Sequence, residues 1–223
     1  MTMYVAFPEC IWHVVANGEL ILLDATRNQF LLFSKEATGE ILKAIKGSLP
    51  PELVVNFIDQ AILVRRKVPQ IINHSYARGL DDFTWSESMR YKTKHYAYKP
   101  SSSELLLAFT ALIGAFITIK TRRLSSILAS NSRSMIAQQE LSDEVIGREI
   151  KSLVHAARLF PSKIACLEFS VALRYRLAKR GAYSSLVIGV QKYSFMAHAW
   201  LELDGQPLGE PSYVSNSLHR LRR

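Results

Sequence analysis

Cysteine is scarce in this chain: only Cys10 and Cys166 occur among 223 residues. The two lie far apart and lack the close spacing of metal ligands, so the sequence excludes a disulfide framework and predicts no metal site. Such sparing use of cysteine is typical of proteins from a reducing compartment. We therefore expect a cytoplasmic protein.

A secretory signal and a long apolar span are also missing. Near the start of the chain, apolar residues alternate with polar ones and do not form the apolar run of a signal peptide. The longest apolar run, residues 104–119, has Glu104 at one end and Lys120 just past the other. Its 16 residues fall short of the roughly 20 that a membrane helix needs. The run therefore predicts a buried helix, and no membrane span is expected.

Acidic residues are in the minority, because 28 Lys and Arg face 19 Asp and Glu and give a net charge of +9. An excess of this size is compatible with nucleic acid, anionic lipid or an acidic peptide as partner. The basic residues are spread along the chain, however, and form neither an aromatic-rich RNA-binding motif nor a basic recognition helix. No nucleic-acid partner is therefore expected, although a non-enzymatic basic winged-helix binding module stays open as an alternative.

The first 67 residues have the pattern of a small module in which strands precede helices. Residues 10–24 contain two apolar-rich runs separated by Asn17-Gly18, which is the strongest short signal for a β-hairpin. A third strand is predicted at residues 29–33. The three strands would supply one sheet of the module.

Two helices are predicted after these strands. Ser34 is a good N-cap for the first helix, which keeps a helical period of apolar residues until Gly47 ends it. Pro50-Pro51 opens the second helix, which runs to about Leu63. The whole module has about the size of a winged-helix domain.

Residues 68–103 are predicted to form a connecting segment, because polar and aromatic residues dominate its central part and apolar repeats are few. Residues 104–223 are then predicted to form the second domain. A helical period of apolar residues predicts one of its helices at residues 142–160.

Cys166 lies where turn chemistry gives way to helix chemistry. Pro161 ends the preceding helix, and a new helix is predicted from about Ser162 until Gly181 ends it. Cys166 then falls in the first turns, where unpaired backbone amides and the positive end of the helix dipole favour a thiolate. The alternative is a buried cysteine that only fills space.

The elements that follow favour the reactive cysteine. Residues 183–190 and 195–203 are predicted strands, the second carries His198, and a further strand is predicted at residues 206–210. A helix with Cys at its start, then His on a strand and an acid on the next strand, is the order of a Cys-His-acid triad in papain-like and transglutaminase-like cores. An α+β fold is therefore predicted.

Several short segments within residues 160–211 together resemble a known family. They are residues 166–173 (CLEFSVAL), Arg180-Gly181, residues 186–190 (LVIGV), residues 197–202 (AHAWLE), Gly205 and Glu210. This pattern resembles the B proteins of lasso-peptide biosynthesis, which are transglutaminase-like cysteine peptidases. The resemblance implies the catalytic residues Cys166, His198 and Glu210. Members usually carry Asp as the third residue, so Glu210 departs from the family by one methylene.

The resemblance also implies partners. Such peptidases remove the leader from a ribosomally made lasso-peptide precursor, so that a macrolactam synthetase similar to asparagine synthetase can close the ring. In fused members the N-terminal part is a precursor-recognition domain similar to PqqD, and the module at residues 1–67 agrees with that. The triad requires no cofactor, and the sequence leaves any need for ATP open.

Hairpin geometry bears on the choice of the acid. If Asp204-Gly205 is a two-residue turn, Glu210 falls opposite Ala199 and faces away from His198. If a three-residue loop ends at Gly205, the register shifts by one and Glu210 lies beside His198. We predict the three-residue loop, with Glu210 as the acid and Glu202 as the runner-up.

The third strand of the N-terminal module is the candidate for leader binding. An extended leader can add a strand to an open sheet edge, using main-chain hydrogen bonds for affinity and side-chain pockets for selectivity. The candidate residues form the predicted edge strand: Gln29, Phe30, Leu31, Leu32 and Phe33. A scaffold strand without a binding role is the alternative, as is, for the whole protein, an acyltransferase or transglutaminase that uses the same triad.

Overall fold

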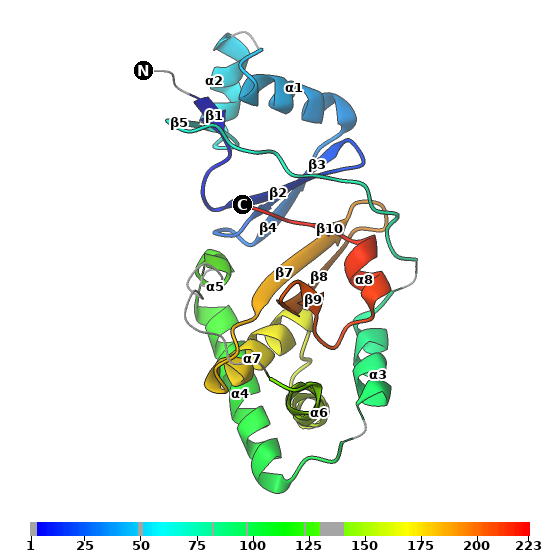
Figure 1. The fold of residues 1–223 in the computed structure, drawn as a ribbon. Coiled ribbons are helices and arrows are strands. Elements are labelled where there is room, and N and C mark those ends of the chain that lie inside the picture. Colours follow the sequence, from blue (N-terminus) through cyan, green and yellow to red (C-terminus); the bar gives the residue numbers. More distant parts are fainter. Residues whose placement is uncertain (1–3, 49–50, 82, 97, 123, 130–140) are drawn as a thin grey trace. The chain divides into compact units, whose positions relative to one another are not determined.

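The structure is a computed structural model that describes residues 4–48, 51–81, 83–96, 98–122, 124–129 and 141–223 (Figure 1). The chain divides into two compact units. The first unit comprises Met1–Ala77, Gln191–Phe195 and His219–Arg223, and the second comprises Arg78–Val190 and Met196–Leu218. Each unit is described by itself.

The first unit is built on a four-stranded sheet in the order β4-β3-β2-β6. Its strands are β2 (Ile11–Ala16), β3 (Glu19–Asp24), β4 (Gln29–Leu32) and β6 (His74–Ser75). The predicted hairpin is confirmed, because Ala16 pairs with Glu19 across Asn17-Gly18. Both turn residues have positive φ, 49° and 88°, as a type I′ turn requires. β4 is an edge strand of this sheet.

Two helices and a small second sheet complete the first unit. They are α1 (Lys35–Ile45), α2 (Pro51–Asp59), and the antiparallel pair β1 (Tyr4–Ala6) with β5 (Val64–Arg66). The predicted cap is confirmed, since the Ser34 hydroxyl accepts the N–H of Ala37 at 3.3 Å. α2 ends four residues before the predicted Leu63, which is buried instead in the core beneath the sheet. Pro50, the predicted start of α2, lies outside the described residues.

The second unit places helices around a short antiparallel sheet. Its elements are α3 (Trp85–His95), α4 (Ser102–Thr121), α5 (Leu124–Ala129), α6 (Asp143–Leu159), α7 (Cys166–Lys179), β7 (Ser185–Gln191), β8 (Met196–Leu203), β9 (Gln206–Pro207) and α8 (Ser212–Ser217). α7 contacts β8 and is flanked by α4 and α6 (Figure 1). The last strand, β10 (His219–Arg220), belongs to the first unit, in which the backbone of Arg222 bonds to that of His13.

The segment predicted as a connection is structured. It contains β6 and α3, and the division between the two compact units falls inside it, after Ala77. α3 begins with a capping box in which Thr84 and Glu87 satisfy each other's backbone N–H groups. α3 is polar on average and therefore lacks the apolar repeat that marks a helix, but the Thr84-x-x-Glu87 spacing was a readable start signal.

The apolar helix α4 is only partly buried. It has 20 residues, so by length and composition it is able to cross a membrane, although core helices of soluble proteins pass the same test. One face is buried and contains Ala108, Ala111, Leu112 and Ala115. The opposite face exposes Leu106, Leu107, Ile113 and Ile117. The prediction of a buried helix therefore holds for one face of α4 and is wrong for the other.

The predicted three-residue loop after β8 is wrong. Leu203 pairs with Gln206, so Asp204-Gly205 is a two-residue turn, and both residues have positive φ, 50° and 78°. The same register continues to Leu208, whose N–H donates to the carbonyl of Leu201 at 2.8 Å. The predicted strand at residues 206–210 also shortens to β9, because Gly209 at φ 67° turns the chain out of the ladder.

Candidate active site

Cys166 is the first residue of α7. Pro161 follows the end of α6, and the chain then runs through an extended N-cap, Ala165, into the helix. Glu168 supports this start, because its carboxylate accepts the N–H of Ala165 at 3.2 Å. The thiol is free and partly exposed. A nucleophile at this point has the unpaired amides of the first helical turn around it and remains accessible to a substrate.

His198 projects from β8 into a nearly closed aromatic pocket. Its side chain is 3% exposed, and three aromatic rings surround the imidazole with centroids at 5.3–6.0 Å: Phe83, Trp85 and Trp200. Phe83 lies just before α3, and Trp85 is the first residue of α3. Trp200 lies two residues after His198 on the same face of β8. These rings fix the orientation of the imidazole and exclude water from it.

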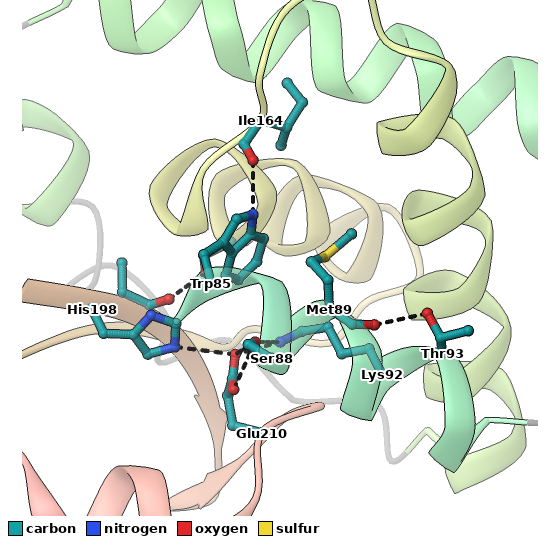
Figure 2. A network of polar contacts seen from close by, with 10 residues as sticks. Trp85, Ser88, Met89, Lys92, Thr93, Ile164, His198 and Glu210 are labelled. Carbon is teal, nitrogen blue, oxygen red and sulfur yellow. Dashed lines mark hydrogen bonds and ion pairs between the residues drawn. The ribbon is translucent and has the colours of Figure 1, made fainter. Parts of the chain in front are cut away.

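Two bonds hold α7 and α3 in place around this pocket. The hydroxyl of Ser170, one turn after Cys166, donates to the carbonyl of Ala199 at 3.1 Å and ties α7 to β8. The indole N–H of Trp85 donates to the carbonyl of Ile164 at 2.8 Å and ties α3 to the segment before Cys166 (Figure 2). The side chains of Cys166 and His198 interact within this pocket.

The charge state of His198 depends on its two acidic neighbours. Burial, the largest influence, favours the neutral imidazole, but the interactions of the ring with Cys166 and with Glu210, including the negative charges of both, outweigh it. Together they raise the pKa of His198 to about 9. At neutral pH the ring is therefore an imidazolium, the form that pairs with a cysteine thiolate.

Glu210 lies against His198 despite the register. After Gly209 turns the chain, the Oε1 atom of Glu210 is 3.2 Å from Nε2 of His198 (Figure 2). The distance is that of an ion pair, but the ring N–H is not well aligned for a hydrogen bond. Catalytic hydrogen bonds are often loose before substrate binds. The runner-up, Glu202, instead accepts the indole N–H of Trp200 at 2.9 Å.

Sequence reasoning missed two polar residues of this site, Ser88 and Lys92 of α3. The Ser88 hydroxyl lies 2.8 and 2.9 Å from the two carboxylate oxygens of Glu210, and the Lys92 ammonium contacts Oε1 of the same carboxylate (Figure 2). Burial tends to raise the pKa of Glu210, but His198 and the charge of Lys92 outweigh it, and the net shift is downward. The carboxylate therefore stays ionised.

The leader-binding candidates belong to the first unit. Gln29, Phe30, Leu31 and Leu32 form β4, and Phe33 follows it with its N–H bonded to the carbonyl of Leu20. The strand has the predicted edge position. Leu31 and Leu32 are 39% and 43% exposed, which is high for leucine, whereas Phe30 packs edge-on against Phe195 at 5.2 Å.

No cluster of His, Cys, Asp and Glu suited to a metal ion occurs among the residues that the structure describes. A thiol, an imidazole and a carboxylate meet at Cys166, and these are the groups that a Cys-His-acid triad uses for acyl transfer.

The comparison with protein families agrees with this arrangement. The model of the transglutaminase-like superfamily matches residues 109–223, just over half of the chain. The chain belongs to the transglutaminase-like superfamily. The match contains Cys166, His198 and Glu210, and the α+β class agrees with it. α3, which carries Ser88 and Lys92, lies before the matched residues.

One curated relative of this transglutaminase-like protein is the microcin J25-processing protein McjB of Escherichia coli. The two are 29% identical over 100 residues, which are 45% of this chain and 48% of McjB. The similarity thus spans about half the length of that relative. No solved structure matches the chain significantly.

The raised pKa of His198 predicts where the imidazole titrates and where its contribution to stability ends. Because the folded-state pKa of about 9 exceeds the ordinary 6.5, the imidazolium stabilises the fold fully below pH 6.5, and this contribution is lost as pH rises through 9. NMR titration of the imidazole carbons should give a midpoint near 9. In Cys166→Ala the midpoint should fall, because a hydrogen-bonding partner is removed. A wild-type midpoint near 6.5 would contradict the ion-pair assignment.

Proposed function

We propose that this protein is a cysteine peptidase that removes the leader from a ribosomally made lasso-peptide precursor. The observation that carries the proposal is the convergence of Cys166, His198 and Glu210 in a transglutaminase-like core. The similarity to a microcin-processing protein favours a lasso-peptide precursor over other peptides as the substrate.

The chemistry follows from the geometry of the three residues. The Cys166 thiolate attacks the scissile carbonyl, and the His198 imidazolium gives its proton to the departing amine of the core peptide. Water, deprotonated by the now neutral His198, then attacks the thioester and releases the leader acid and the thiolate. Glu210 holds the ring in the useful tautomer and stabilises its charge. The backbone N–H of Cys166, free at the helix start, is the donor we assign to the oxyanion.

The rest of the pathway is proposed from the resemblance. The first unit acts as a PqqD-like recognition domain that binds the leader in the cytoplasm, where the reaction would take place. The released core peptide is passed to an asparagine-synthetase-like enzyme that closes the macrolactam ring. The synthetase needs the free core N-terminus that cleavage creates, so leader removal must come first.

Mass spectrometry of a precursor incubated with the protein tests the function. A peptidase transfers the leader acyl group to water, so the products are the free leader acid and the core peptide. An acyltransferase or transglutaminase with the same triad transfers the acyl group to an added primary amine, which increases the product mass accordingly. An intact precursor after incubation, with ATP present and absent, would contradict both functions.

Edge-strand binding of the leader predicts a strong effect of one backbone N–H. Since the N–H of Phe33 donates into the sheet, the alternation of an antiparallel strand directs the N–H of Leu32 outward. Leu32→Pro removes this donor while every bond to β3 is kept, and edge strands tolerate proline. Leader affinity, measured by calorimetry on the full chain, should fall about tenfold or more, which corresponds to the loss of one good hydrogen bond.

The control for this variant is Leu32→Ala, which keeps the N–H and truncates the side chain. It should bind the leader more tightly than Leu32→Pro if main-chain bonds dominate. Both variants should keep the wild-type melting temperature to within a few degrees. Unchanged binding by a folded Leu32→Pro variant would show that the leader does not use this edge.

A further inference from the structure

Lys92 is a lysine whose charged end is buried in the protein. Its side chain is 2% exposed, yet its ammonium contacts the carboxylate of Glu210 and lies 2.5 Å from the Ser88 hydroxyl. The faces of Trp85 and Phe169 lie 5.1 and 5.5 Å from the same nitrogen. Lysine is almost never buried unless it is paired, and here burial lowers the pKa of Lys92 while the Glu210 carboxylate opposes that shift.

The contacts around Lys92 form a continuous chain to the nucleophile. The Lys92 ammonium donates to Ser88 and Glu210, Ser88 bridges both oxygens of Glu210, and Glu210 lies beside His198. His198 in turn is bonded to Cys166. Two cations and two anions therefore alternate in one row that runs from buried Lys92 to partly exposed Cys166, with a net charge of zero when the cysteine is a thiolate.

Two other titratable groups, Lys151 and Tyr96, lie near α3. From α6, the apolar end of Ile150 lies near the same turn at Gly209 as the Lys92 stem. Lys151 of α6 donates instead to the backbone carbonyl of Thr93 at 2.5 Å. The phenol of Tyr96, the residue after α3, stays neutral, because burial first, then Tyr91 and Asp143, and least the Glu210 carboxylate raise its pKa to about 12.

We propose that Lys92 and Ser88 are positioning residues that hold the Glu210 carboxylate against His198 and set the pH range in which Cys166 reacts. This rests on the proposed function only in taking Cys166 as the nucleophile. Glu is one methylene longer than Asp and has one more torsion to fix. Two donors from α3 fix it, and they leave Oε1 directed at the imidazole.

The positive charge of Lys92 determines the direction in which its removal should shift the pH profile of Cys166. Lys92 is the single cation of the row that is not part of the proposed triad. A cation favours the deprotonated form of every neighbouring acid, so its removal should make Glu210, His198 and Cys166 all hold their protons to higher pH. The whole pH profile should therefore move upward. Loss of packing alone would lower the rate without moving the profile.

The test uses Lys92→Met in the full chain, which keeps the length and apolar contacts of the side chain and removes its charge. The rate of Cys166 alkylation by iodoacetamide is measured against pH, with peptide mapping to separate Cys10. The profile should shift upward by about one pH unit or more. Leader removal should lose rate in kcat with KM unchanged, because Lys92 does not touch substrate.

Lys151→Met is the matched control. It removes a buried lysine that bonds to the same helix, α3, but does not face Glu210. Its alkylation profile should coincide with that of the wild type. A Lys92→Met profile that also coincides with the wild type, or an equal shift in Lys151→Met, would overturn the proposal. Alkylation needs no precursor, so failure of this proposal is distinguishable from failure of the peptidase function.

A double variant keeps the proposal testable if Lys92→Met is poorly folded. Glu210→Gln leaves the Lys92 charge buried without its partner and should lower the melting temperature. Adding Lys92→Met makes the pair neutral and should restore most of that loss, while leader removal stays low. If the second substitution lowers the melting temperature further, Lys92 does not act through Glu210.

Discussion

Replacement of Cys166 by alanine is expected to lower leader removal by about 10⁴-fold or more, because the thioester can no longer form. Leader binding should be unchanged, since the candidate binding strand β4 belongs to the first unit and Cys166 belongs to the second. The measurements are single-turnover cleavage followed by mass spectrometry, and calorimetry with the leader peptide.

Cys10→Ala is the control for this variant, because it removes the other thiol. Cys10 is partly buried against the core of the first unit, so its loss should cost little stability and leave cleavage at the wild-type rate. Appreciable leader removal by Cys166→Ala would exclude the cysteine-peptidase mechanism, whatever Cys10→Ala does.

The second large effect is expected for Glu210→Gln. An amide is nearly isosteric with the carboxylate but cannot stabilise the imidazolium, so kcat should fall by about 10³- to 10⁴-fold. The change also leaves Lys92 buried without a counter-charge, which should destabilise the fold by about 3–5 kcal/mol. Cleavage kinetics and thermal unfolding measure the two effects separately.

Glu202→Gln is the comparison that decides between the two carboxylates. Glu202 bonds to the Trp200 indole, and glutamine can keep that bond through its carbonyl oxygen. The rate of Glu202→Gln should therefore stay within a few-fold of wild type. A normal rate for Glu210→Gln together with a strong loss for Glu202→Gln would reverse the assignment of the acid.

The two predicted hairpin turns show how much of a hairpin's register can be predicted from the turn residues alone. Asn17-Gly18 lies between strands of matched length, and the turn type that its residues favour fixed the register. Asp204-Gly205 offered two registers, because glycine suits the last position of either loop. The two-residue turn formed, and the distance of Glu210 from His198 was then decided outside the ladder, at Gly209.

The sequence by itself determined which elements carry Cys166 and His198, the proposed nucleophile and base. Pro161 and Gly181 bound the segment that contains α7, and the alternation of residues in β8 sets the side on which His198 points. These signals act over a few residues, through capping, backbone restriction and the pleat of a strand. They are therefore readable without knowledge of the rest of the chain.

Only the tertiary structure decided what surrounds the acid. Ser88 and Lys92 reach Glu210 across 122 and 118 residues of sequence, from a polar helix whose pattern favoured a connecting segment. A buried charge is stable only next to an opposite charge. The contact between Lys92 and Glu210 depends on how α3 packs against α6 and on the turn at Gly209. No local pattern reports such a pair, because the two partners lie 118 residues apart in the sequence.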